Sequence, residues 1–195
     1  MIKIGITGGI GSGKSVVSRI LQVLDIPIYI ADDEAKKLMV SDPHIKKSLI
    51  ALLGNQVYLD GQLNKKLLAN YLFAKPEHTK EINDIVHPRV KEDFLTWCEK
   101  NQECPIVGIE SAILFEAGFK NAVDYSILVY ASEEVRLERA IKRDKSTAEL
   151  IAKRIAAQTP DREKLLLTDF LVYNDGNIAI LPQVLFLLQE LKKTI

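Results

Sequence analysis

A glycine-rich segment near the start of the chain carries the most specific chemical signal in the sequence. Gly8 is followed by four residues and then by Gly13-Lys14-Ser15, which matches the phosphate-binding pattern G-x-x-x-x-G-K-[ST]. Glycines let successive backbone N–H groups turn inward around an anion, at dihedral angles and distances that a Cβ atom would obstruct. In this pattern Lys14 reaches the β- and γ-phosphates and the Ser15 hydroxyl ligates Mg²⁺. The segment therefore predicts a binding site for a nucleoside triphosphate with magnesium.

Two other interpretations of the segment need no triphosphate. It could be a glycine-rich turn with an exposed lysine, or its backbone N–H groups could serve a dinucleotide, as the alternation of Gly9, Gly11 and Gly13 suggests. The third glycine is misplaced for G-x-G-x-x-G, and Lys14 and Ser15 would have no role in that interpretation. A mononucleoside triphosphate is favoured.

The elements that must hold this segment are short apolar runs rich in Ile and Val. They predict strands at residues 2–6, 27–31, 105–109 and 125–130, with a fifth at 170–173 or just beyond it at 177–180. Apolar residues from Val16 to Leu24 repeat at helical spacing, so the glycine segment lies between a strand and a helix. Strands that alternate with helices predict a doubly wound α/β fold with a five-stranded parallel sheet.

Residues 33–103 separate the second and third strands, and they carry helical patterns without a convincing strand. This stretch is far longer than one crossover needs, so we expect a helical insertion within a single domain spanning residues 1–195. A chain of 195 residues that is 47% hydrophobic can bury one substantial core.

Charge and cysteine content exclude several classes of protein. The 26 basic and 26 acidic residues cancel, so no global field would attract nucleic acid or an anionic membrane. Cys98 and Cys104 lack partners for a zinc site, and no secretory signal is visible, so we expect reduced thiols and a cytoplasmic protein. The late apolar stretch is broken by Pro182, Gln183 and Gln189, and it falls short of the ~20 residues that a membrane span needs.

Two carboxylates follow predicted strands at the edge of the sheet where ligand sites of α/β proteins form. Asp32, the first residue after the second strand, could accept the proton of an attacking hydroxyl; alternatively Asp32 or Asp33 only caps the next helix. Glu110 follows the third strand, where an acidic residue approaches Mg²⁺ through water, and it too could be a plain helix cap.

A basic helical region follows the fourth strand. Arg136, Arg139 and Arg143 are spaced three and four apart and share a helix face, which fits a lid that closes over developing phosphate charge. Ordinary surface charge is the alternative, since acidic residues are interspersed. The guanine-reading sequence N-K-x-D is absent, which argues against a GTP-driven switch.

The ordered series of motifs resembles the dephospho-CoA kinases, which phosphorylate the ribose 3′-hydroxyl of dephospho-CoA in the last step of coenzyme A synthesis. The motifs are Gly5 to Ser15, Ala31-Asp32, His87-Pro88, Glu110, Leu114-Phe115-Glu116, Arg136-Leu-Glu-Arg139, Arg154-Ile-Ala-Ala-Gln158, and Asp169 through Asn174-Asp175-Gly176. This resemblance implies ATP with Mg²⁺ and dephospho-CoA as partners, no nucleic-acid or membrane partner, a monomer or weak homo-oligomer, an acceptor-binding insertion, and a lid over about 139–158.

The resemblance also implies roles for individual residues. Asp32 would be the base, with Lys14 and Arg139 assisting catalysis. The ATP contacts would be Gly9, Gly11, Ser12, Gly13, Lys14, Ser15, Val16, Arg143 and Asn174. The acceptor contacts would be Asp32, His87, Glu110 and Phe115. Mg²⁺ would be held by Ser15, with Asp32 or Glu110 through water.

Departures from the family pattern occur at Ile30, at Asn64-Lys65 and at Ala112, where an acid, Asp-Arg and Pro are usual. They put acceptor affinity and the shape of the insertion in question, because lysine cannot reproduce the bidentate fork of arginine. The alternatives are another nucleoside or nucleotide kinase on the same scaffold and, in a different class, a nucleotide-binding regulatory module or a nucleic-acid ATPase.

Overall fold

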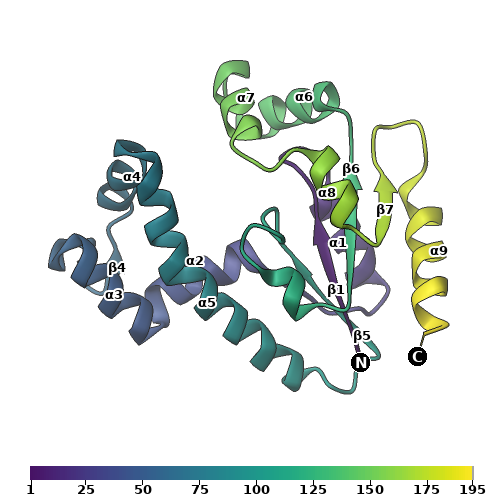
Figure 1. Cartoon of the computed structure of the whole chain (residues 1–195), viewed down its shortest axis with the longest axis horizontal. Coiled ribbons are helices and arrows are strands. Elements are labelled where there is room, and N and C mark those ends of the chain that lie inside the picture. The colour runs from purple at the N-terminus through teal and green to yellow at the C-terminus, as the bar shows by residue number, and fades with distance from the viewer. Residues whose placement is uncertain (195) are drawn as a thin grey trace. The chain divides into compact units, whose positions relative to one another are not determined.

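The computed structural model describes residues 1–194, and its central feature is a five-stranded sheet in the order β2-β5-β1-β6-β7 (Figure 1). The strands are β1 (Ile2–Thr7), β2 (Ile28–Ile30), β5 (Ile106–Glu110), β6 (Tyr125–Tyr130) and β7 (Phe170–Tyr173). The pairs β1–β5, β1–β6 and β6–β7 are parallel. The predicted α/β class with a five-stranded parallel sheet is therefore confirmed.

The fifth strand lies at residues 170–173, so the alternative at 177–180 is wrong. Asn174-Asp175-Gly176 ends the strand, because Gly176 adopts φ 97 and Asp175 accepts a hydrogen bond from the Asn177 N–H at 3.0 Å. An aspartate that bonds the backbone two residues later favours a turn over continued pairing.

The strands are continuous apolar runs because both faces of the sheet are buried. Ile4 and Ile6 of β1 and Ile127 and Leu128 of β6 are fully buried. Strands covered on both faces carry continuous Ile, Val and Leu rather than alternating polar residues. The sheet thereby fixes the end of β1, from which the glycine segment begins.

The sheet and the helices around it form one compact unit, Met1–Tyr29 with Cys98–Ile195. Its helices are α1 (Lys14–Val23), α6 (Glu133–Asp144), α7 (Ala148–Ala156), α8 (Asp161–Leu167) and α9 (Ile180–Lys192), with a short 3₁₀ helix η2 (Phe119–Ala122). Helices α6 and α7 pack on each other, and α9 packs on β7 and α1 (Figure 1). Ser132 and Thr147 cap α6 and α7 through their hydroxyls.

The second compact unit, Ile30–Trp97, overlaps the predicted insertion 33–103. It contains α2 (Ala31–Ser41), α3 (Pro43–Leu53), the 3₁₀ helix η1 (Asn55–Val57), β3 (Tyr58–Leu59), β4 (Gln62–Leu63), α4 (Lys65–Ala74) and most of α5 (Pro76–Lys100). The expectation of no strand here is wrong, because β3 and β4 form an antiparallel hairpin. Its turn is Asp60-Gly61, with φ 49 and 77, and Asp-Gly is a hairpin signal that the sequence displays.

Asp42 joins α2 to α3 and anchors α5. Its carboxylate accepts hydrogen bonds from the N–H groups of His44 and Ile45 at 2.8 and 2.9 Å, and from Arg89 Nε at 3.0 Å. Burial opposes ionisation of this carboxyl, but these bonds and the Arg89 charge outweigh it and lower the pKa of Asp42. Asp42 is thus a buried ion-pair partner as well as a helix cap.

Candidate nucleotide and phosphotransfer site

The glycine segment bridges β1 and α1 as a loop that wraps around the N-terminus of the helix. Gly13 is the N-cap of α1, with φ 93, and Lys14 begins the helix. Lys14 Nζ donates hydrogen bonds to the carbonyl oxygens of Gly8 and Gly9 at 2.9 and 3.3 Å. The loop thus places a cation and the positive end of a helix together, which is the arrangement that binds a phosphate.

Two of the loop glycines lie directly against the side chains of other elements. A Cβ on Gly9 would lie 1.5 Å from a guanidinium nitrogen of Arg136, and a Cβ on Gly13 would lie 2.0 Å from the Asn174 amide nitrogen. Both distances are far below a van der Waals contact. The glycines of this loop therefore give room to neighbouring side chains as well as to a ligand.

Asn174 and Arg139 reach the loop from other elements. Asn174 Nδ2 donates to the carbonyl of Ser12 at 2.8 Å, and Arg139 donates to the carbonyl of Asn174 at 2.6 Å. The Asn174 N–H in turn bonds the Tyr130 carbonyl at the end of β6. The structure thus brings together three of the predicted residues from the loop, from α6 and from the end of β7; their roles toward ATP stay predictions.

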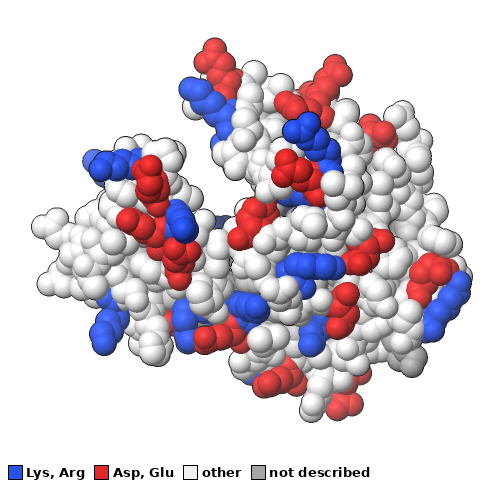
Figure 2. Space-filling view, viewed as in Figure 1, with Lys and Arg blue, Asp and Glu red and all other residues white. Residues whose placement is uncertain are grey.

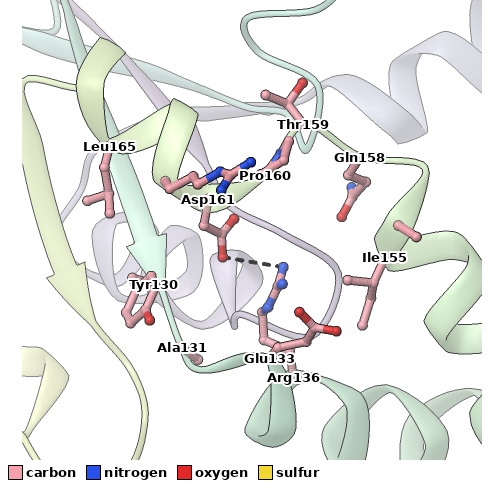
Figure 3. A pocket seen from close by; sticks show the side chains of 12 residues that line it. Tyr130, Ala131, Glu133, Arg136, Ile155, Gln158, Thr159, Pro160, Asp161 and Leu165 are labelled. Atoms are coloured by element: carbon pink, nitrogen blue, oxygen red, sulfur yellow. Dashed lines mark ion pairs between the residues drawn. The ribbon is translucent and has the colours of Figure 1, made fainter.

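Arg136 lies at a cavity of about 420 Å³ beside the loop, and it was not among the predicted site residues. It is 6% exposed, and its guanidinium faces Asp161 of α8 at 3.4 Å (Figure 3). Arg136 Nε and Asp161 Oδ1 are buried and have no hydrogen-bond partner within residues 1–194. The basic run contained Arg136, but a pairing partner so distant in sequence carries no local signal.

Arg143 lies in the last turn of α6 and is exposed. It bonds one oxygen of Asp144 at 2.7 Å, and Arg154 of α7 bonds the other oxygen at 2.7 Å. These hydrogen bonds lower the pKa of Asp144 to about 2, so the carboxylate is charged at any ordinary pH. The arginines that the spacing placed on one helix face consequently have three separate partners: Asp161, Asn174 and Asp144.

Glu110 ends β5 in register with Ile6 of β1, two residues before Gly8. The following segment carries Phe115, which is half-buried, and it is tied to α8 by Lys164. Lys164 is fully buried, donates to the Ala112 carbonyl at 3.1 Å and pairs with Glu116 at 3.4 Å. Because the bond uses the backbone carbonyl of Ala112, the departure from proline there leaves this contact in place.

Asp32 lies in the second compact unit and is exposed. It was predicted to be the first residue after the strand, which is wrong: β2 ends at Ile30 and α2 begins at Ala31, so Asp32 is in the first helical turn. Ile30 occupies the N-cap position without a side-chain bond, so neither Asp32 nor Asp33 is the cap. Asp33 instead pairs with Lys36 at 2.8 Å.

His87 is half-buried in α5. Burial lowers its pKa, and the charges of Asp84 and Asp32 oppose that effect only partly, so the ring is neutral at physiological pH.

Asn64, one of the departures from the family pattern, has a structural role, because its side chain caps α4 by accepting a hydrogen bond from the Leu67 N–H at 3.1 Å.

Charges of both signs are interspersed over the face of the molecule seen in Figure 2. Across residues 1–194, no helix is both long and apolar enough to span a bilayer, and no three His, Cys, Asp or Glu side chains are grouped to hold a metal ion. Cys98 is buried, and that burial raises its pKa to about 11.

Comparison with known proteins gives a consistent result over the whole chain. The family model described as dephospho-CoA kinase matches residues 2–179. A dephospho-CoA kinase from Bacteroides fragilis is 50% identical over 194 residues, covering 100% of this chain and 95% of the relative. One from Porphyromonas gingivalis is 42% identical over 98% of this chain and 95% of its own length.

Solved structures share the fold over nearly the whole chain. A Thermus thermophilus protein superposes with a TM-score of 0.82 at 31% identity, over 97% of this chain and 96% of its own. A dephospho-CoA kinase from Campylobacter jejuni, at 23% identity, shares the fold with a TM-score of 0.72 over 98% of each chain. The chain belongs to the dephospho-CoA kinase family.

Proposed function

We propose that this protein transfers the γ-phosphoryl group of ATP to the ribose 3′-hydroxyl of dephospho-CoA, giving coenzyme A and ADP. The observation that carries the proposal is the phosphate loop, in which Lys14 is bonded across Gly8 and Gly9 at the N-terminus of α1. Membership of the dephospho-CoA kinase family along nearly the whole chain supports the choice of acceptor.

The loop fits ATP bound with Mg²⁺. Ser15 is at the surface in the first turn of α1, and the buried Ser12 hydroxyl has no hydrogen-bond partner within residues 1–194, so both hydroxyls suit a polar ligand. Ser15 would hold Mg²⁺, with Asp32 or Glu110 reaching it through water, and the ion would neutralise charge on the phosphate oxygens. The remaining ATP contacts are assigned to Gly9, Gly11, Gly13, Val16, Arg143 and Asn174.

Asp32 takes the proton of the 3′-hydroxyl in this proposal. Phosphoryl transfer through a loose transition state needs only a modest base, so orientation of the hydroxyl matters more than basicity. His87, Glu110 and Phe115 are assigned to acceptor binding, and the neutral ring of His87 can donate or accept one hydrogen bond.

The segment from Arg139 to Gln158 is proposed as the lid that excludes water during transfer, with Arg139 stabilising charge on the transferred group. The unit Ile30–Trp97 is proposed as the acceptor-binding insertion. We also expect a cytoplasmic protein that is a monomer or weak homo-oligomer and has no nucleic-acid or membrane partner.

An acceptor panel tests the proposal. ADP release is measured with dephospho-CoA and, in parallel, with a range of nucleosides and nucleotides, using Lys14→Ala as the variant that must lose activity. A dominant response to dephospho-CoA supports the assignment, and a dominant response to any other compound overturns it. ATP hydrolysis with and without DNA or RNA tests the remaining alternative, since stimulation by nucleic acid contradicts a small-molecule kinase.

A further inference from the structure

Ile10, at the middle of the phosphate loop, packs against the two helices of the segment proposed as the lid. Its side chain packs against a cluster of the buried residues Ala140, Ile151 and Ile155, against which Leu137 and Ile141 also pack. These residues come from α6 and α7. The loop therefore shares an apolar cluster with both helices through the side chain of Ile10.

The backbone of Ile10 is held by the segment that follows α7. The Ile10 N–H donates to Gln158 Oε1 at 2.8 Å, and the Gln158 N–H itself bonds the Ile155 carbonyl at 3.0 Å. Gln158 lies two residues after the end of α7 and lines the cavity of Figure 3. The hydrogen bond to Ile155 thus holds Gln158 against α7, and the hydrogen bond from Ile10 ties the peptide between Gly9 and Ile10 to Gln158.

A third contact acts on the preceding residue of the loop. The Arg136 guanidinium lies directly on the backbone of Gly9 and faces Asp161, the first residue of α8. Gly9 and Ile10 are consequently contacted by residues that precede and follow α7 in the sequence. Arg136 lies near the start of α6, and Gln158 lies between α7 and α8.

From these three contacts, we propose that Ile10 and Gln158 are positioning residues for ATP, through which α7 sets the conformation of the phosphate loop. The Ile10 N–H belongs to the same peptide as the Gly9 carbonyl, which accepts a hydrogen bond from Lys14 Nζ at 3.3 Å, so the orientation of this peptide affects where the lysine of the loop lies. By accepting from the Ile10 N–H, Gln158 fixes the orientation of that peptide. This inference rests on the proposed use of the loop for ATP, but it does not depend on which acceptor is phosphorylated.

Gln158→Leu is the principal test. It replaces the amide with an apolar side chain of similar size and leaves the Ile10 N–H without its acceptor, so we expect the Kd for MgATP, measured by calorimetry, to rise about tenfold. The KM for ATP should rise by the same factor, while the KM for dephospho-CoA stays at the wild-type value. A purely structural role would lower the melting temperature without separating the two KM values.

Ile10→Val with Ile127→Val provides a matched pair. Each substitution removes one methyl group, from the loop and from the fully buried core of β6 respectively. Ile10→Val should weaken ATP binding several-fold, whereas Ile127→Val should lower the melting temperature and leave ATP binding unchanged.

Gln158→Glu retains an oxygen acceptor but adds a negative charge beside the loop. It should keep the wild-type melting temperature and weaken the binding of ATP more than the binding of ADP.

The inference is overturned if Gln158→Leu folds normally and binds MgATP with wild-type affinity, or if Ile10→Val and Ile127→Val alter ATP binding equally. The affinity for MgATP is measured without acceptor, so this test is independent of the proposed function. If the wild-type protein does not phosphorylate dephospho-CoA but Gln158→Leu still weakens MgATP binding, only the proposed function is refuted.

Discussion

Arg139 donates a hydrogen bond to the backbone carbonyl of Asn174 at 2.6 Å, across 35 positions of sequence. Asn174 in turn bonds the Ser12 carbonyl at 2.8 Å, so the guanidinium is linked to the phosphate loop through a single intervening residue. A cation held in this way is oriented before any ligand arrives, which is the condition under which electrostatic stabilisation of a transition state is most effective.

Arg139→Ala should lower kcat by roughly 10²- to 10³-fold, because one preorganised donor to the transferred group is lost. The KM for dephospho-CoA should change much less. Arg139→Lys keeps the charge but loses the planar fork, and we expect an intermediate kcat. Steady-state kinetics with each substrate varied in turn provide the measurement. A defect confined to acceptor affinity would contradict the role given to Arg139.

Asp32→Asn should retain ATP affinity and lose at least about 10²-fold in turnover, since an amide cannot accept the hydroxyl proton. The neighbouring Asp33→Asn is the control, because Asp33 is exposed and paired with Lys36. ATP binding by calorimetry and single-turnover rates separate the two effects. Undiminished turnover in Asp32→Asn would exclude it as the base.

Gly13→Ala tests the space in the phosphate loop. Gly13 has φ 93, and its added Cβ would lie 2.0 Å from the Asn174 amide; Gly61 has φ 77 and open space around it. Alanine at either position carries the left-handed strain of about 1–2 kcal/mol. Only Gly13→Ala should also abolish measurable ATP binding, with Gly61→Ala as its control. If both variants bind ATP equally well, the close approach of Asn174 to Gly13 does not affect ATP binding.

Asp42→Asn should lower the free energy of unfolding at pH 7 by about 1–3 kcal/mol, through loss of charged hydrogen bonds to Arg89 and to the backbone. Because the folded pKa of Asp42 lies below its ordinary value of 3.8, the stabilisation is complete above pH 3.8 and disappears as the pH falls through the folded pKa. Urea unfolding of both proteins, followed from neutral pH down to the acid limit of folding, measures this. A difference that stays constant down to the lowest pH would show that ionisation of Asp42 is not involved.

Several features could be predicted from local sequence because local physics produces them. The phosphate loop, the strands and the first helix follow from glycine conformation and from the periodicity of apolar residues. The hairpin at Asp60-Gly61 was missed although its turn carries a recognisable signal, because its strands span only Tyr58–Leu59 and Gln62–Leu63. The boundary at Ala31 was one residue off, as helix starts without a capping side chain often are.

The sequence by itself determined that a phosphate loop lies between a buried strand and a helix, since the residues from Gly8 to Ser15 and their apolar flanks specify that arrangement. Only the tertiary structure decided what holds the loop in place: Gln158 on the Ile10 N–H, Arg136 on Gly9 and Asn174 on Ser12. Gln158 and Asn174 lie 148 and 162 positions away from the loop residues that they bond. A hydrogen bond over such a separation depends on the packing of the whole sheet and leaves no pattern in any short stretch of sequence.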